Sequence, residues 1–132
     1  MVLPDPIPVV RDWLVTHPAV GPLISGAHTA LPSSVSLPVV RLTRIGGTPR
    51  VAFRLDRAVI QLDVFGRTDE EAGAVAGAVR AAMWALCGHS TLTAVVIDVD
   101  ELTGPRSVPD DTRTPPTPRL VMSFAVAIRP EP

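Results

Sequence analysis

Residues 57–66 alternate between apolar and mostly polar side chains along the segment RAVIQLDVFG. One side of this alternation is wholly apolar and consists of Ala58, Ile60, Leu62 and Val64. A period of two with one apolar side predicts a β-strand that places one face in a hydrophobic core. Gly66 and Arg67 interrupt the pattern, so the strand is expected to end there.

A helical pattern follows directly after this strand. Thr68 and Glu71 have the spacing of a capping box, in which the hydroxyl accepts from first-turn amides and the glutamate reaches back to Thr68. Apolar positions then recur at the helical period as far as residue 86 or 87, and Gly88 suits the C-terminal turn. The expected buried side of the helix consists of Ala72, Val75, Val79, Ala82, Met83 and Leu86.

The opposite side of this helix is nearly uncharged, whereas a solvated side normally carries several charged or amide residues. Its residues are Gly73, Gly77, Arg80, Trp84 and Cys87. We therefore expect this side to contact a second partner. Two partners fit the pattern: the N-terminal helix of the same chain, or a neighbouring subunit.

The remaining elements are a short N-terminal helix and further strands. The helix is expected to begin after Asp5, an N-cap residue before Pro6, and to end near His17 because Pro18 follows. Strand patterns are found at residues 27–31 (weak), 37–45, 93–102 and 119–129. The pattern places Val95, Ile97 and Val99 on one face of their strand, and a loop or irregular hairpin tip is expected over 46–56.

This order of elements predicts one α+β domain over residues 1–132. Its expected architecture is a single, mostly antiparallel β-sheet of about four to five strands. The long helix after the central strand packs on one face, together with the short N-terminal helix.

Residues 103–118 lie between the last two predicted strands and contain five prolines in 16 residues. A loop of this length in a compact domain is usually functional or ordered only on binding. Arg106, Asp110, Asp111 and Arg113 give it charges of both signs. We expect this loop to be mobile in the free protein and ordered against a neighbour in an assembly.

The composition limits the classes of protein that fit. The chain has 132 residues, 46% of them hydrophobic, and a formal net charge of −1, which excludes a disordered chain and a polyanion binder by composition. No apolar run approaches the roughly 18–20 residues that span a bilayer, and no secretory signal is expected. A single cysteine cannot form an internal disulfide, so a reducing compartment is expected.

No residue pattern points to catalysis, a cofactor or a metal. The histidines His17, His28 and His89 lie outside any metal-binding spacing. Cys87 is predicted at a helix C-terminus, where the dipole does not favour a thiolate. The pairs Asp98/Asp100 and Asp110/Asp111 read as solvated carboxylates.

Five arginines cluster around the second and central strands: Arg41, Arg44, Arg50, Arg54 and Arg57. Three interpretations fit this cluster: contact with another protein's acidic surface, ordinary solvent exposure, and nucleic-acid binding. A nucleic-acid surface would also need aromatic platforms, and Phe53 alone lies within the cluster.

The chain resembles the tail-terminator (tail-completion) proteins of long-tailed bacteriophages, in particular those of actinobacteriophages. The resemblance extends over about residues 5–129 and is one of pattern and order. The segments that carry it are VVRDWL at 9–14 with His17-Pro18, Leu31-Pro32, LPVVRLTRIGG at 37–47, VIQLDVFG at 59–66 running into TDEEA at 68–72, and the terminal pair of strands.

This resemblance implies a non-enzymatic structural subunit of the virion, assembled in the host cytoplasm, that forms a homohexameric ring at the head-proximal end of the tail. The implied partners are other copies of the chain, the major tail tube protein and the head–tail connector or stopper protein. DNA would pass through the lumen without sequence-specific binding, and no membrane is involved. Two alternatives remain: a head-completion or connector protein of the virion neck, and a small ligand-binding or enzymatic α+β domain.

The residues expected at such interfaces come from three parts of the chain. They are Arg44, Arg50, Phe53, Arg54, Arg57, Gly73, Gly77, Arg80, Trp84, Arg106, Asp110, Asp111 and Arg113.

Overall fold

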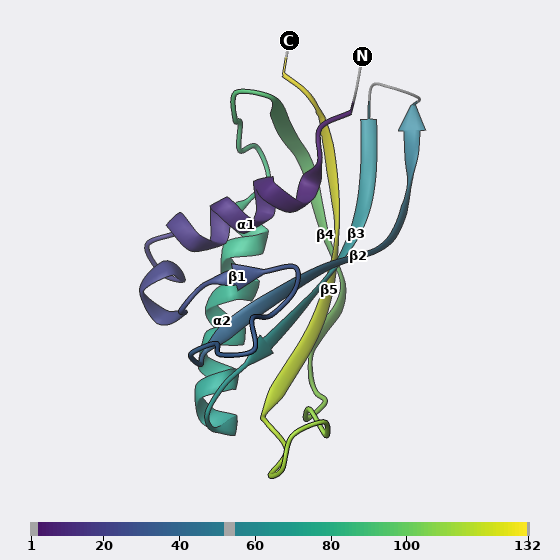
Figure 1. Ribbon diagram of the computed structural model, residues 1–132. Helices are drawn as coiled ribbons and strands as arrows, with labels where there is room; N and C mark the ends of the chain where they lie inside the picture. Colours follow the sequence, from purple (N-terminus) through teal and green to yellow (C-terminus); the bar gives the residue numbers. More distant parts are fainter. Residues whose placement is uncertain (1–2, 52–54, 132) are drawn as a thin grey trace.

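The computed structural model describes residues 3–51 and 55–131, with the side chains of 48–51 left out (Figure 1). In this part of the chain, five strands form one sheet in the order β1-β2-β3-β5-β4. The strands are β1 (Ala27–His28), β2 (Val39–Val51), β3 (Leu55–Phe65), β4 (Ala94–Ser107) and β5 (Arg119–Pro130). The short β1 pairs in parallel with β2, and all other neighbours are antiparallel.

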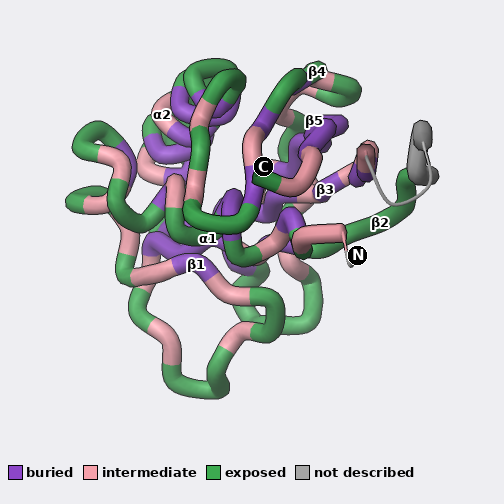
Figure 2. The backbone as a smooth tube through the Cα atoms, turned by 90° about the horizontal axis from the view of Figure 1, so that it is seen from above, coloured by how far each residue is buried: buried purple, intermediate pink, exposed green. Residues whose placement is uncertain are grey.

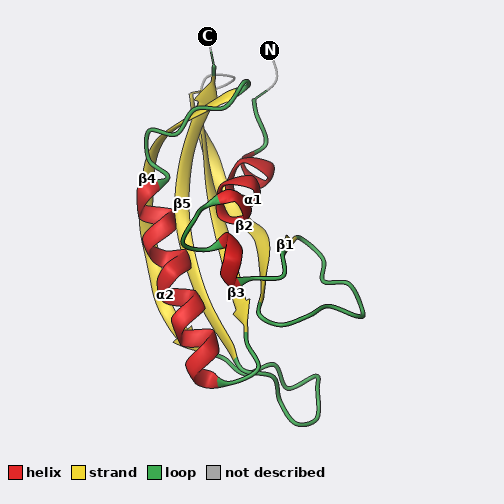
Figure 3. Cartoon of the chain, turned by 90° about the vertical axis from the view of Figure 1, so that its left-hand side faces the viewer, coloured by secondary structure: helices red, strands yellow, loops and turns green. Residues whose placement is uncertain are grey.

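Two helices cover one face of this sheet, and no helix of the described residues covers the other. Figure 3 shows α1 (Pro6–Thr16) and α2 (Asp69–Ala85) on the same side of the strands, with the 3₁₀ turn η1 (Gly21–Leu23) after α1. Buried residues gather where the helices face the sheet (Figure 2). The predicted α+β fold, with a mostly antiparallel sheet and helices on one face, is confirmed.

The central strand and the long helix form the core as predicted. All four apolar residues of one face of β3 are fully buried, and so is the predicted buried side of α2. Thr68 Oγ1 accepts from the amide of Glu71 at 3.1 Å, which confirms the N-cap. The Glu71 carboxylate, however, accepts from the amide of Arg67 at 2.9 Å and from its guanidinium, and not from the amide of Thr68 as predicted.

Of the two expectations for 46–56, the loop is wrong, because β2 continues through both glycines and Pro49 to Val51. The irregular hairpin agrees with the antiparallel pairing of β2 and β3 and its two register shifts. A register shift between Arg44 and Gly46 absorbs the irregularity. Gly47 has a φ of +112°, and a Cβ atom there would lie 2.1 Å from the carbonyl oxygen of Arg57. The glycine therefore permits close strand pairing at a bulge and does not end the strand.

The strand β4 differs from its prediction in length and in its faces. Thr103 and Arg106 pair with β5, so the proline-rich segment between β4 and β5 spans 108–118 and not 103–118. A register shift between Val96 and Asp98 also breaks the simple alternation. As a result Val96 and Val99 are buried, whereas Ile97 is 41% exposed, and the prediction of Val95, Ile97 and Val99 on one face is wrong.

Candidate assembly surfaces

The residues predicted at interfaces fall into three separate places: the β2–β3 hairpin, the outward side of α2, and the end of β4 with the 108–118 segment. The hairpin and the 108–118 segment lie at opposite ends of the sheet along the strand direction (Figure 1). The structure therefore does not bring these residues together into one site.

The hairpin arginines bind carboxylates of their own chain. Arg44 donates to both carboxylate oxygens of the buried Asp56 at 2.8 and 2.9 Å, and this hydrogen bonding raises the pKa of Arg44. Arg57 reaches across β5 to Asp100, with 3.5 Å between Nη2 and Oδ2. Arg44 thus connects the neighbouring strands β2 and β3, whereas Arg57 connects β3 to β4 across β5. Phe53 and Arg54, and the side chain of Arg50, lie outside the described residues.

The outward side of α2 is exposed, with Gly73, Gly77 and Trp84 on it. The interpretation that α1 covers this side is wrong. Trp13 of α1 donates from Nε1 to the carbonyl oxygen of Ala82 at 2.8 Å, and α1 packs over β1 and β2. The remaining interpretation, a neighbouring subunit, stays a prediction.

Arg80, the one charged residue on this side of α2, forms an ion pair with Glu101 of β4. Arg80 Nη2 donates to Glu101 Oε2 at 2.8 Å, and Nε donates to Oε1. Hydrogen bonding from Arg80 lowers the pKa of the Glu101 carboxyl. Gly104 lies close by, since a Cβ atom there would be 3.7 Å from Glu101 Oε2. The helix side and the β4 edge therefore form one continuous surface.

The 108–118 segment has internal hydrogen bonds of its own. Asp110 and Thr117 exchange both backbone hydrogen bonds, at 2.8 and 3.1 Å. The Asp110 carboxylate accepts from the hydroxyl of Thr112 at 2.6 Å, and this bond lowers the pKa of Asp110. Arg113 lies 3.9 Å from Asp110, while Asp111 and Arg106 are exposed. Its expected mobility in the free protein stays a prediction.

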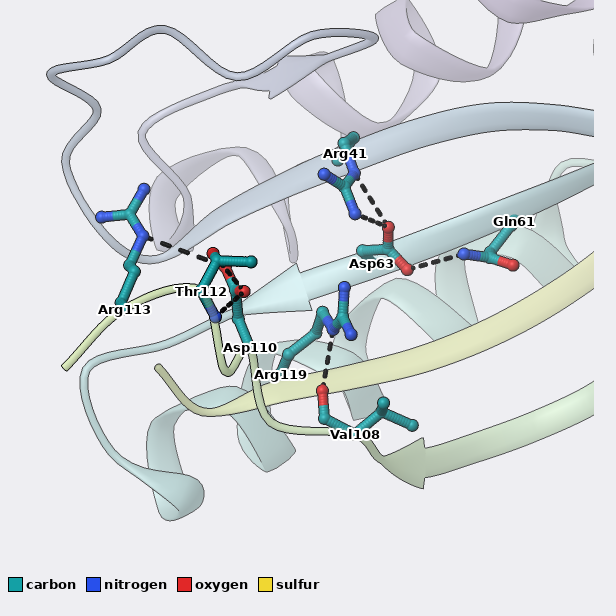
Figure 4. Close-up of polar contacts among 8 residues, drawn as sticks. All are labelled: Arg41, Gln61, Asp63, Val108, Asp110, Thr112, Arg113 and Arg119. Atoms are coloured by element: carbon teal, nitrogen blue, oxygen red, sulfur yellow. Dashed lines mark hydrogen bonds and ion pairs between the residues drawn. The ribbon is translucent and has the colours of Figure 1, made fainter. Parts of the chain in front are cut away.

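A buried polar cluster that was not predicted from the sequence lies beside this segment (Figure 4). Asp63 is fully buried on the sheet face away from the helices, and its Oδ2 accepts from Arg41 Nε at 2.9 Å and Nη2 at 2.7 Å. Its Oδ1 accepts from Gln61 at 3.0 Å. Phe65 lies between the guanidinium groups of Arg41 and Arg119, at 5.3 and 5.8 Å from its ring centroid. The only signal for this cluster in the sequence was Asp63, a carboxylate on the partly polar side of the central strand.

The Arg119 side chain links this cluster to the 108–118 segment. Its Nε donates to the carbonyl oxygen of Val108 at 2.7 Å, and the Val108 amide donates to the Arg119 carbonyl at 2.9 Å. The base of the segment is thereby fixed to the end of the sheet, whereas its tip extends beyond the sheet (Figure 4).

Among the described residues, no group of three or more histidine, cysteine or acidic side chains is placed to hold a metal ion. None of the helices in the described part of the chain has the length and apolar character needed to cross a membrane.

Two comparisons with known proteins gave a match, one to a family and one to a solved structure. Residues 8–86, which extend from α1 to just past α2, match the family described as "Tail completion protein gp17". A solved chain from the "Virion of native gene transfer agent (GTA) particle" has a similar fold, with a TM-score of 0.64 and 18% identity over 91% of each chain. No curated protein matches the sequence.

Proposed function

Because this chain belongs to the tail completion protein gp17 family and is a structural protein of the virion tail, we propose that it closes the finished tail tube as a ring. The family match carries this proposal, since it includes both helices and the strands β1 to β3. A protein of this kind acts by binding and not by catalysis. The ring, a hexamer by resemblance, occupies the end of the tube and so prevents further subunits from adding.

The two ends of the sheet support a role between two different partners. The β2–β3 hairpin lies at one end and the 108–118 segment at the other, so one subunit has a separate contact region for each side of a ring. We assign one end to the tail tube protein and the other to the head–tail connector. DNA passes through the lumen of this ring without sequence-specific contacts.

The charged residues at these ends are suited to protein contacts. Asp111 and Arg106 are exposed, and Asp110 and Arg113 lie beside them on the 108–118 segment. Charges of both signs at the rim of an interface favour orientation and rapid association more than affinity. Such contacts suit a ring that must recognise the end of a tube.

The test is to remove the gene from the particle genome and examine the lysate by electron microscopy. We expect tails of uncontrolled length without heads, and normal particles when the intact gene is supplied in trans. Gold-labelled antibody should mark the head-proximal end of normal tails. Label along the whole tube, or normal tails joined to heads without the protein, would show that the proposed function is wrong.

A further inference from the structure

Both edges of the sheet have open backbone groups in the described residues. Residues 88–91 bond to the start of β4, but between Asp98 and Ser107 the described backbone–backbone bonds of β4 go to β5 alone, and the amide of Val99 donates to Asp98 Oδ1. At the other edge, β1 covers β2 only at Val40 and Arg41, so β2 is open from Leu42 onward. An open edge of this length is a template for pairing with another chain.

Exposed apolar side chains lie beside both open edges. Ile97 and Leu102 are exposed on β4, and the half-exposed Trp84 lies on the outward side of α2. On the opposite edge, Ile45 is 53% exposed at the bulge of β2. Large exposed apolar side chains at two opposite flanks indicate two contact surfaces rather than one.

The two edges also differ in charge. The sequence of β4 has Asp98, Asp100 and Glu101 with the single arginine Arg106, whereas that of β2 has three arginines and no acidic residue. Most of these charges are paired within the chain, Arg44 with Asp56, Asp100 with Arg57 and Glu101 with Arg80. Contact between unlike flanks follows from the proposed ring, because a ring of more than two copies needs a head-to-tail interface.

The strand directions suit such a contact. β2 is antiparallel to β3, β3 to β5 and β5 to β4, so β4 runs opposite to β2. In a ring whose axis runs along the strands, neighbouring copies are related by a rotation that leaves the strand directions unchanged. The β4 edge of one copy therefore meets the β2 edge of the next in antiparallel orientation. Unlike surfaces that meet in this way form a ring when the rotation between neighbours closes.

We infer that the open β4 edge of each subunit lies against the open β2 edge of its neighbour, with the outward side of α2 facing the neighbour's helix layer. The inference rests on the proposed ring and identifies the surface that closes it. The sheet and the helix layer then both continue from one subunit to the next. In this arrangement the uncharged side of α2, with Gly77 and Trp84, is covered by a second copy.

The cross-strand register of the sheet indicates which residues of two neighbouring copies come near one another. Arg44, Ile60, Phe124 and Glu101 share one row across β2, β3, β5 and β4. Ile45 and Leu102 each follow an end of this row in the chain, and because β2 and β4 run in opposite directions they lie on opposite sides of it, about 7 Å apart along the strands. If Glu101 of one copy lies opposite Arg44 of the next, cysteines at these two positions are diagonal neighbours that a short cross-linker can join.

The test uses assembled tails that contain a Cys87→Ser variant, so that only introduced thiols react. Ile45→Cys and Leu102→Cys are added together, and each is added alone as a matched control. After treatment with a short bis-maleimide, the double variant should give species of two copies up to the full ring, and each single variant should give none.

Three results would overturn the inference. Cross-linked dimers from either single variant indicate contact between like flanks. A double variant that does not cross-link, in tails of normal length with the protein at the head-proximal end, leaves the proposed function intact and removes this interface. Absence of the protein from the tail end refutes the proposed function itself, and with it the ring that this interface would close.

Hydrogen exchange of the unmodified protein gives a second measurement that needs no substitution. Backbone amides of 42–51 and 98–107 should exchange more slowly in tails than in the free chain, while those of the central strand β3 should change little. Equal exchange of both edges in the two states contradicts the inference.

Discussion

Replacing Asp63 by alanine tests the energetic role of the buried polar cluster. The carboxylate accepts three hydrogen bonds, from Arg41 at 2.9 and 2.7 Å and from Gln61 at 3.0 Å, and it is fully buried. Removing one partner of a buried ion pair costs about 3–5 kcal/mol because the other charge is left without compensation. The Arg41 side chain is 33% exposed, so water can replace part of the lost interaction. We therefore expect a loss of about 2–4 kcal/mol in the free energy of unfolding.

Urea denaturation of the purified chain measures this loss as a shift in midpoint at unchanged m-value. Asp98→Ala is the matched control, because Asp98 is exposed and accepts only from the amide of Val99. Its effect should stay within about 0.5 kcal/mol. If Asp63→Ala costs no more than this control, the cluster does not stabilise the sheet in the way described.

A double-mutant cycle separates the pair from its surroundings. Arg41→Met alone leaves the Asp63 carboxylate buried without its guanidinium, so it should also destabilise the fold. The double variant should lose less than the sum of the two single variants, by at least about 1 kcal/mol. Simple additivity would show that the two side chains do not act as a unit.

Three further predictions concern the core, the ion pair between Arg80 of α2 and Glu101 of β4, and the proline-rich segment. Leu62→Ala should cost about 2–5 kcal/mol in the same denaturation assay, because Leu62 is fully buried between the sheet and the helices; unchanged stability would contradict the core assignment. Hydrogen bonding from Arg80 lowers the pKa of Glu101 in the folded chain, so its contribution to stability is full above the ordinary pKa of 4.5 and is lost as pH falls through the lowered value. Glu101→Gln should therefore reduce the loss of stability on acidification below pH 4.5, and an identical acid profile would exclude this contribution. Replacing 109–117 by a short turn should leave the melting temperature near that of the unmodified chain but give overlong or headless tails. Normal particles would show that the segment only connects β4 to β5.

The sequence predicted the elements whose signals are local. The period-two pattern of β3 and the capping threonine of α2 depend on residues within a few positions of one another, and both were confirmed. The glycine pair in β2 and Pro105 in β4 looked like breaks, because their turn propensity is local whereas the strand pairing that overrides it is not.

The candidate surfaces were predictable only in part for the same reason. Arg44 was correctly placed on the second strand and Arg57 on the central strand, but their partners Asp56 and Asp100 could be assigned only from the register of the sheet. Arg41 and Asp63 are 22 residues apart in sequence and directly opposite in β2 and β3. Cross-strand register depends on the packing of the whole sheet, and no short motif in the sequence encodes it.

The position of the two proposed contact regions at opposite ends of the strands has a mechanical consequence. A pull between a partner at the β2–β3 hairpin and another at the 108–118 segment acts along β3 and β5, which pair from Asp56 to Phe65. Hydrogen bonds between antiparallel strands are perpendicular to that direction. The load is then shared by many bonds at once in shear, whereas a pull across the sheet would open them one after another. A particle whose head and tail are strained against each other would transmit that tension through the stiffest direction of this subunit.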